Sequence, residues 1–160
     1  MPKLLSLFIV LFLLGSCAKN TVFSEYQSIP DAKWSKNNVI KFTFNAIDTI
    51  EKNTIFINLR NNKDYGFNNI YLIVDVDFPN GIQLKDTLQY KMTDDYGYFL
   101  GNGFTDIKEN KLEFKPNTIF PVKGAYHFSV QQAMRKNGSE HGLLELQGIT
   151  DVGISIEKIN

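Results

Sequence analysis

The chain has 160 residues, with 17 basic and 17 acidic side chains and a formal net charge of zero. This balance gives no electrostatic reason to expect nucleic acid as a partner, because nucleic-acid binding depends on clustered cations. A single cysteine excludes a disulfide within the chain, and thirteen phenylalanines with seven tyrosines favour a sheet-rich core held by packing alone.

The chain begins with the pattern of a lipoprotein signal peptide. Lys3 gives a short positive start, and Leu4 to Leu14 is an apolar run too short to span a bilayer as a permanent helix. Leu14-Gly15-Ser16-Cys17 is a lipobox, in which the cysteine sulfur is acylated and the chain is cut just before it. We expect residues 1–16 to be the signal peptide and Cys17 to carry a lipid anchor. The alternative is an anchor helix that ends in an incidental cysteine.

About 144 residues remain after the signal peptide, enough for one domain with a hydrophobic core. Residues 17–37 are polar and irregular in pattern, and we interpret them as a lipid-anchored tether and lead-in segment. Residues 38–160 contain the periodic segments and form the predicted domain.

The alternation of apolar and polar residues that is typical of half-buried strands begins at Val39. The strongest pattern predicts a long hairpin from Ile70 to Met92, with a turn at Pro79-Asn80-Gly81. Asp86 falls on its apolar side, opposite Val74 if the turn is tight, so Asp86 needs a sheet edge or a partner. Shorter strands are predicted around residues 39–44, 55–59, 112–114, 126–130 and 152–156.

No segment shows the pattern of an amphipathic helix longer than two turns. Strands joined by turns throughout a chain of this length predict an all-β protein. We expect an antiparallel β-sandwich of about seven or eight strands, either immunoglobulin-like or a jelly-roll.

No residue pattern predicts a metal site or a catalytic nucleophile. His127 and His141 are the only histidines, and neither has metal-ligand spacing. Asp75 and Asp77 emerge on one face of a strand. They either form a cation site or belong to the solvated side of that strand. We therefore expect a protein that is not an enzyme and that uses no metal or cofactor.

Several aromatic residues do not fit the inward-facing positions of the predicted strands. These candidates for exposed rings are Trp34, Phe56, Tyr71, Tyr96 and Tyr98. Exposed rings can stack on sugars or bind a partner protein. In a sandwich with many loops, such rings can instead be buried in the core. Both interpretations stay open at this point.

A loop near the C-terminus is a candidate partner-binding surface. Leu143, Leu144 and Leu146 lie in an irregular stretch, where they either plug one end of the core or form a docking surface. Arg135 either forks onto a carboxylate such as Asp151 or reaches an acidic group of a partner.

Thr49 and Thr87 are candidate O-glycosylation sites. Asp48-Thr49-Ile50 and Asp86-Thr87-Leu88 resemble the Asp-Ser/Thr-aliphatic acceptor that is used in Bacteroidota. A tripeptide this short also arises by chance.

Together, these motifs resemble those of the gliding-motility lipoprotein GldH family of Bacteroidota. The likeness covers nearly the whole mature chain, and the lipobox belongs to it. It is carried by Phe56-Ile57-Asn58-Leu59-Arg60-Asn61-Asn62 with Asp64-Tyr65, Phe78-Pro79-Asn80-Gly81, Lys85-Asp86-Thr87-Leu88, Gly103-Phe104, Asp106-Ile107-Lys108, Gln132-Ala133-Met134-Arg135 and Gly148-Ile149-Thr150-Asp151-Val152-Gly153. The resemblance implies a lipoprotein needed for surface gliding and associated with machinery that overlaps protein secretion. It implies no catalytic residues.

The leading hypothesis is a non-enzymatic structural or assembly lipoprotein that binds other envelope proteins of the gliding machinery. The runner-up is a carbohydrate- or peptidoglycan-binding module that uses exposed aromatic rings on a glycan. Ala18-Lys19-Asn20 contains no acidic run of the kind linked to surface display in these bacteria. We therefore expect the domain to face the periplasm, with the outer membrane favoured.

Overall fold

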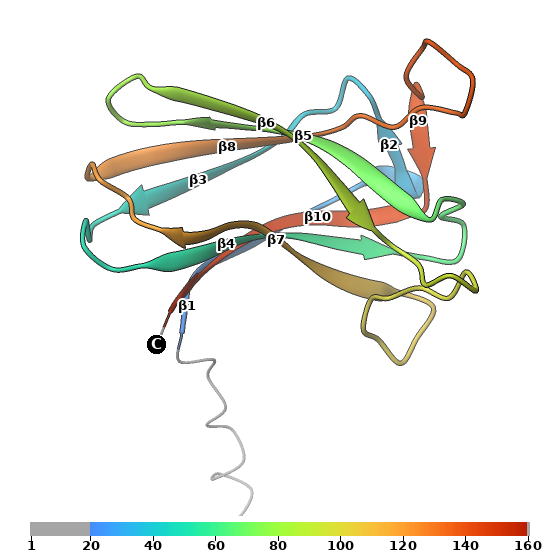
Figure 1. Ribbon diagram of the computed structural model, residues 1–160, viewed down its shortest axis with the longest axis horizontal. Coiled ribbons are helices and arrows are strands. Elements are labelled where there is room, and N and C mark those ends of the chain that lie inside the picture. Colours follow the sequence, from blue (N-terminus) through green and yellow to red (C-terminus); the bar gives the residue numbers. More distant parts are fainter. Residues whose placement is uncertain (1–19, 160) are drawn as a thin grey trace, which may run out of the picture.

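The computed structural model describes residues 20–159, so the predicted signal peptide and Cys17 lie outside the described residues. Figure 1 shows two layers of strands that pack face to face. The elements are β1 (Thr21–Ser28), the 3-10 helix η1 (Pro30–Ala32), β2 (Lys33–Ser35), β3 (Ile40–Ala46), β4 (Asn53–Asn61), β5 (Asn69–Asp77), β6 (Gln83–Lys91), β7 (Lys108–Thr118), β8 (Gly124–Gln132), β9 (Glu145–Gln147) and β10 (Ile149–Lys158). None of the helices in this part of the chain has the length and apolar character needed to cross a membrane.

The strands follow a nested antiparallel order. One sheet has the order β1-β10-β4-β7, the facing sheet has the order β3-β8-β5-β6, and β2 with β9 forms a small third sheet. Each strand pairs with the one at the mirrored position in the chain, from β1 with β10 inward to β5 with β6. A nested ribbon folded into two facing sheets is a jelly roll, so the β-sandwich prediction is confirmed in its jelly-roll form.

The core lies between the two four-stranded sheets. Its centre is made by side chains that point inward from β4 and β10 on one side and from β5 and β8 on the other. The fully buried members of this set are Ile57, Leu59, Val152, Ile154, Ile156, Ile70, Leu72, Val74, Phe128 and Val130. Burying one such side chain contributes about 1.5–3 kcal/mol, which is how packing holds a fold without a disulfide.

The predicted hairpin is confirmed as β5 and β6, and its register places Val74 opposite Asp86. Asp86 lies on an edge strand and also has a partner, since its Oδ2 is 2.7 Å from Lys115 Nζ on β7. Because β6 and β7 are edge strands of opposite sheets, this ion pair bridges the two sheets along one open side of the sandwich.

One end of the sandwich, here called the terminal end, contains both the start of β1 and the end of β10. It comprises residues 20–22, 47–52, 78–82, 119–123 and 158–159, and it lies at the left of Figure 1. Five aromatic rings close the core beneath these loops, each within 6 Å of the next. They run in the order Phe23, Phe44, Phe120, Tyr126 and Phe78, with centroid distances of 5.6, 4.9, 4.9 and 5.0 Å.

The expectation that residues 17–37 are irregular is wrong for two segments, because β1 and β2 lie there. β1 is an edge strand whose side chains are mostly exposed or half-buried, so it carries no apolar alternation. β2 and its partner β9 have three residues each, which is too short for a periodic signal. The folded domain therefore takes up most of the segment predicted to be a tether.

The confirmed hairpin register predicts how strongly two of its residues contribute to stability. Leu72→Ala should lower the free energy of unfolding by about 2–5 kcal/mol, because it leaves a cavity in the packed core. Lys85→Ala should change it by about 0.5 kcal/mol or less, since the exposed pair of Lys85 Nζ with Asp75 Oδ1, at 3.2 Å, contributes little. Urea unfolding of the two variants measures both values, and the opposite ranking would contradict the inward orientation of Leu72.

Candidate functional site

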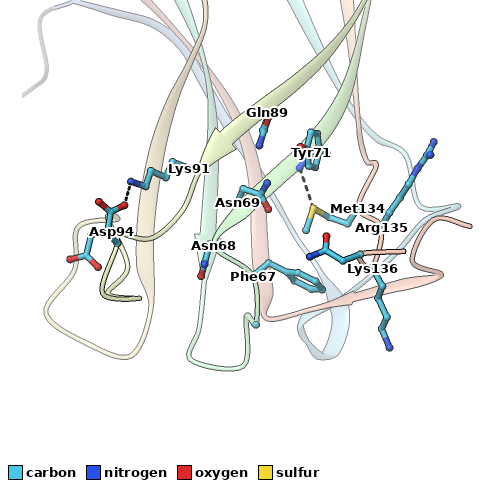
Figure 2. Close-up of a pocket in the computed structure, with 13 residues that line it drawn as sticks. Phe67, Asn68, Asn69, Tyr71, Gln89, Lys91, Asp94, Met134, Arg135 and Lys136 are labelled. Carbon is cyan, nitrogen blue, oxygen red and sulfur yellow. Dashed lines mark hydrogen bonds and ion pairs between the residues drawn. The ribbon is translucent and has the colours of Figure 1, made fainter. Parts of the chain in front are cut away.

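The end of the sandwich opposite the terminal end, here called the groove end, contains an open groove of about 940 Å³. Strands β5 and β6 form its floor, and the β4–β5 loop and the segment after β8 form its walls (Figure 2). The lining residues are Gly66, Phe67, Asn68, Asn69, Tyr71, Gln89, Lys91, Asp94, Asp95, Met134, Arg135, Lys136 and Asn137. Amides and charged groups predominate, with two aromatic rings among them.

The floor of the groove is formed by Tyr71 and Gln89, which are cross-strand neighbours. Tyr71 is 37% exposed, so its predicted exposure is confirmed. Its backbone is held by the segment after β8: the Tyr71 N–H donates to Met134 Sδ at 3.2 Å, and the Tyr71 carbonyl accepts from Ala133 N at 2.8 Å. The ring is therefore presented to solvent from a fixed backbone position.

The wall formed by the β4–β5 loop is fixed from below by Tyr65. This residue is 3% exposed, its hydroxyl donates to the Asn69 carbonyl at 2.7 Å, and burial raises the pKa of that hydroxyl. Gly148 packs against the backbone of Tyr65 with a φ of +89°, where a Cβ would lie 2.2 Å from Tyr65 N. Only glycine fits there, so the position of this wall depends on a residue far away in the chain.

The wall after β8 is fixed by the Gln132 side chain. Its Oε1 accepts from Met134 N at 3.0 Å, and its Nε2 donates to the Leu143 carbonyl at 2.9 Å. The Leu143 N–H in turn donates to the Met134 carbonyl at 2.7 Å, and Met134 is 2% exposed. Arg135 and Lys136 therefore follow a residue held by hydrogen bonds on both sides, and Figure 2 shows their side chains projecting away from it.

The acidic groups of the groove are already engaged by neighbouring groups. Asp95 pairs with Lys91 at 2.7 Å, and this hydrogen bond lowers the pKa of the Asp95 carboxyl and raises the pKa of the Lys91 ammonium. Asp94 Oδ1 accepts from the backbone N–H groups of Tyr96 and Tyr98, at 2.9 and 2.8 Å. These bonds form the turn that carries both tyrosines.

The cations on the opposite wall are not engaged in this way. Arg135 and Lys136 are exposed and form no ion pair with any residue between 20 and 159. The groove therefore presents amide groups beside the Tyr71 ring and two cations on one wall, a combination suited to a polar or acidic ligand.

Exposed rings project from the β6–β7 loop at the same end. Tyr96 is 89% exposed and Tyr98 is 74% exposed, which confirms that both are exposed as predicted. Phe104, in the same loop, is fully exposed, and the sequence patterns did not identify it as such a residue. It follows Gly101-Asn102-Gly103 in a stretch without strand alternation, so parity gave no information about its orientation.

Two aromatic candidates lie elsewhere. The prediction that Trp34 is exposed is wrong: β2 pairs Trp34 with Leu146 of β9, the ring is fully buried, and its Nε1–H donates to the Asn38 carbonyl at 2.8 Å. Phe56 is half-buried on the outer face of the β1-β10-β4-β7 sheet, where Lys111 Nζ lies 4.3 Å from its ring centroid. Neither residue lines the groove.

The three leucines of the C-terminal loop separate into different environments. Leu146 is fully buried, Leu143 is half-buried and packs against the core, and Leu144 is 77% exposed. Leu143 and Leu146 therefore close the core at this end, while Leu144 alone has the exposure of a docking residue.

The pairing of Arg135 with Asp151 is not formed in the structure. Asp151 accepts hydrogen bonds instead from the hydroxyls of Ser28 and Thr150, both at 2.8 Å. The other possibility for Arg135, an acidic group of a partner, stays a prediction.

The two O-glycosylation candidates differ in setting, and both stay predictions. Thr49 lies in the β3–β4 loop, where Asp48 Oδ1 accepts from Ile50 N at 2.7 Å and from Glu51 N at 2.9 Å and forms a tight turn. These backbone hydrogen bonds lower the pKa of the Asp48 carboxyl, and the bond from Glu51 N has the larger effect. Thr87 is exposed on the edge strand β6.

Within residues 20–159, no three His, Cys, Asp or Glu side chains gather in a way that would hold a metal ion. Asp75 pairs with Lys85 at 3.2 Å, and Asp77 Oδ1 accepts from Gln83 Nε2 at 2.9 Å. Both carboxylates therefore lie among polar partners on the outer face of β5, as expected for the solvated side of a strand.

The different environments of two adjacent leucines give a testable contrast. Leu144→Ser should change the free energy of unfolding by about 0.5 kcal/mol or less, because its side chain is exposed. Leu143→Ser should lower the free energy of unfolding by about 1–2 kcal/mol, because it removes apolar area that packs on the core. Urea unfolding of both variants checks this, and equal losses would show that the whole loop is core.

Three comparisons place this molecule among known proteins. It is 47% identical over 161 residues to the gliding motility lipoprotein GldH homolog of Christiangramia forsetii, covering 99% of this chain and 98% of that protein. It is 45% identical over 152 residues to the gliding motility lipoprotein GldH of Flavobacterium johnsoniae, covering 95% and 94%. A solved GH115 4-O-methyl-alpha-glucuronidase matches 91% of this chain and 18% of its own, with 12% identity and a TM-score of 0.50, a likeness of fold alone.

The sequence model of the GldH lipoprotein family matches residues 21–156, which is nearly the whole described domain. This match and the two relatives agree with the motifs quoted from β4, from the β5–β6 hairpin and from β10. The chain therefore belongs to the GldH lipoprotein family.

Proposed function

We propose that the protein is a non-enzymatic lipoprotein of the bacterial envelope whose groove end docks another protein of the gliding and secretion machinery. A lipid on Cys17 anchors it to a membrane, and the domain faces the periplasm, with the outer membrane favoured. The link to gliding comes from the names of its relatives. The position in the envelope is supported by the lipobox and by the absence of acidic residues at 18–20.

The observation that carries the docking proposal is the combination of fixed walls and exposed anchor residues at the groove end. Tyrosine and arginine, together with tryptophan, are the side chains that contribute most often to binding energy at protein interfaces. Tyr71, Tyr96, Tyr98 and Arg135 all lie at this end. The Tyr71 backbone binds Met134, and Gln132 binds the backbone of Met134, the residue before Arg135. A partner with an acidic group beside apolar side chains would complement them.

A glycan is the second candidate ligand, and one feature of the groove favours it. The Tyr71 ring lies among the amide side chains of Asn68, Asn69 and Gln89. A ring that stacks on a sugar face, with amides that exchange hydrogen bonds with its hydroxyls, is a common arrangement for carbohydrate binding. The cations of the groove suit an acidic sugar.

The anchor is tested by Cys17→Ala in cells that are given labelled palmitate. The substitution removes the only thiol of the chain, so incorporation of label into the protein should be lost. Tyr98→Ala, an exposed change at the groove end, should leave labelling unchanged. Undiminished labelling of the Cys17→Ala protein would contradict the anchor.

The docking surface is tested with a photo-crosslinking amino acid introduced in cells at position 98, or at position 41 on the outer face of β3 as a matched control. We expect crosslinks to a defined envelope protein from position 98, little from position 41, and a several-fold decrease when Arg135→Ala is combined with the probe at 98. Equal crosslinking from both positions would contradict the proposal. Binding of the purified protein to peptidoglycan that depends on Tyr71, without protein crosslinks, would support the glycan alternative.

A further inference from the structure

The terminal end presents exposed aliphatic side chains on three separate loops. Ile47 and Ile50 on the β3–β4 loop are 82% and 81% exposed. Ile82 after the β5–β6 turn is 56% exposed, and Ile119 after β7 is 41% exposed. Figure 1 shows these loops side by side at one end of the sandwich. Four isoleucines at one end are more than the scattered exposure expected of a soluble surface.

Ile119 lines a small apolar pocket with Phe120 and Tyr126, whereas Ile47, Ile50 and Ile82 belong neither to the core nor to that pocket. The aromatic rings beneath them already close the sandwich, and Phe120 and Tyr126 stack edge-on with centroids 4.9 Å apart. The Tyr126 hydroxyl also donates to the Val122 carbonyl at 2.9 Å, which fixes the β7–β8 loop. On the β3–β4 loop, the turn at Asp48 holds Ile50 outward. The exposed isoleucines are therefore presented by an ordered framework.

The chain leaves the domain beside these loops. Asn20 accepts a hydrogen bond from Lys158 N at 2.8 Å, and Ile159 N donates to the Lys52 carbonyl at 3.0 Å. The first described residue therefore lies next to the loop that carries Ile47 and Ile50. Cys17 is three positions before Asn20. Three extended residues span roughly 11 Å at most, so a lipid on Cys17 keeps this end close to the bilayer.

We propose that the terminal end rests on the bilayer, with Ile47, Ile50 and Ile82 inserted at the boundary between headgroups and acyl chains. This proposal depends on the lipid anchor at Cys17 that was proposed above. Apolar side chains on a surface held at a membrane bury their area among the lipids and strengthen attachment. The exposed Lys52 and Lys123 on the same loops are placed to meet lipid phosphates.

The bilayer is favoured over a protein as the occupant because of the short connection. A tether of a few residues gives the membrane a high effective concentration at this end and leaves little room for a protein between the loops and the lipid. At the groove end, by contrast, the nearest lipid is a strand length away. For a nine-residue strand such as β4, this is roughly 30 Å.

The test uses the lipidated full chain in vesicles of phosphatidylethanolamine and phosphatidylglycerol that contain spin-labelled lipid. An environment-sensitive fluorophore is attached at Ile50→Cys or, as a matched control, at Leu144→Cys. The two side chains are similarly exposed, at 81% and 77%, but lie at opposite ends. The acylated Cys17 does not react with the label. Flotation of the vesicles reports in the same sample whether the protein is anchored.

We expect several-fold stronger quenching by the lipid at Ile50→Cys than at Leu144→Cys, in protein that floats with the vesicles. Floating protein with equal quenching at both positions, weak or strong, would overturn the contact while leaving the anchor in place. Protein that does not float would overturn the anchor of the proposed function and this contact together. Flotation thus separates failure of the anchor from failure of the contact.

Discussion

The nested pairing of strands is the constraint on which the rest of this structure depends. Its innermost pair, β5 with β6, is joined by a turn at residues 78–82, whereas its outermost pair, β1 with β10, joins the two ends of the described domain. Ser28 and Asp151, linked by a hydrogen bond of 2.8 Å, are 123 residues apart. This order collects the loops into two groups at opposite ends of the sandwich. The groove and the first described residue, Asn20, are separated for that reason, and each end can take on a surface of its own.

The sequence patterns predicted those parts of the fold in which burial alternates strictly. β3, β5 and β8 place every second residue in the core, and the hairpin register was predictable because a short turn fixes it. β1 was missed because it lies at a sheet edge and alternates little. The burial of Trp34 was missed because it depends on pairing between β2 and β9, two short segments far apart in the sequence. Strand order itself has no local signature, so the sequence left two sandwich types open.

In the candidate site, too, features set by local sequence were predictable and features set by contacts between distant segments were not. The exposure of Tyr71, Tyr96 and Tyr98 was predictable because none of them fits an inward-facing position of a predicted strand. The groove was not predictable, because its floor and walls come from segments that are far apart in the sequence and meet only in the folded domain. Gln132 illustrates the difficulty. It is 1% exposed although it is polar, and its role in fixing Met134 and Leu143 depends on a loop that returns to it. The exposed Phe104 lies in a stretch without periodicity, where parity has no meaning.

The placement of β1 also determines how the domain would respond to tension. β1 runs from the terminal end toward the groove end and pairs with β10 over nearly its whole length, and the Tyr26 ring lies against Gly153 across that pair. A pull exerted through the groove on a protein held at residue 20 would stretch β1 along its own axis. Hydrogen bonds between antiparallel strands lie perpendicular to the strands, so this force would shear them together, whereas a pull at right angles would open them one after another. In this geometry the strand that follows residue 20 resists extraction as one cooperative unit.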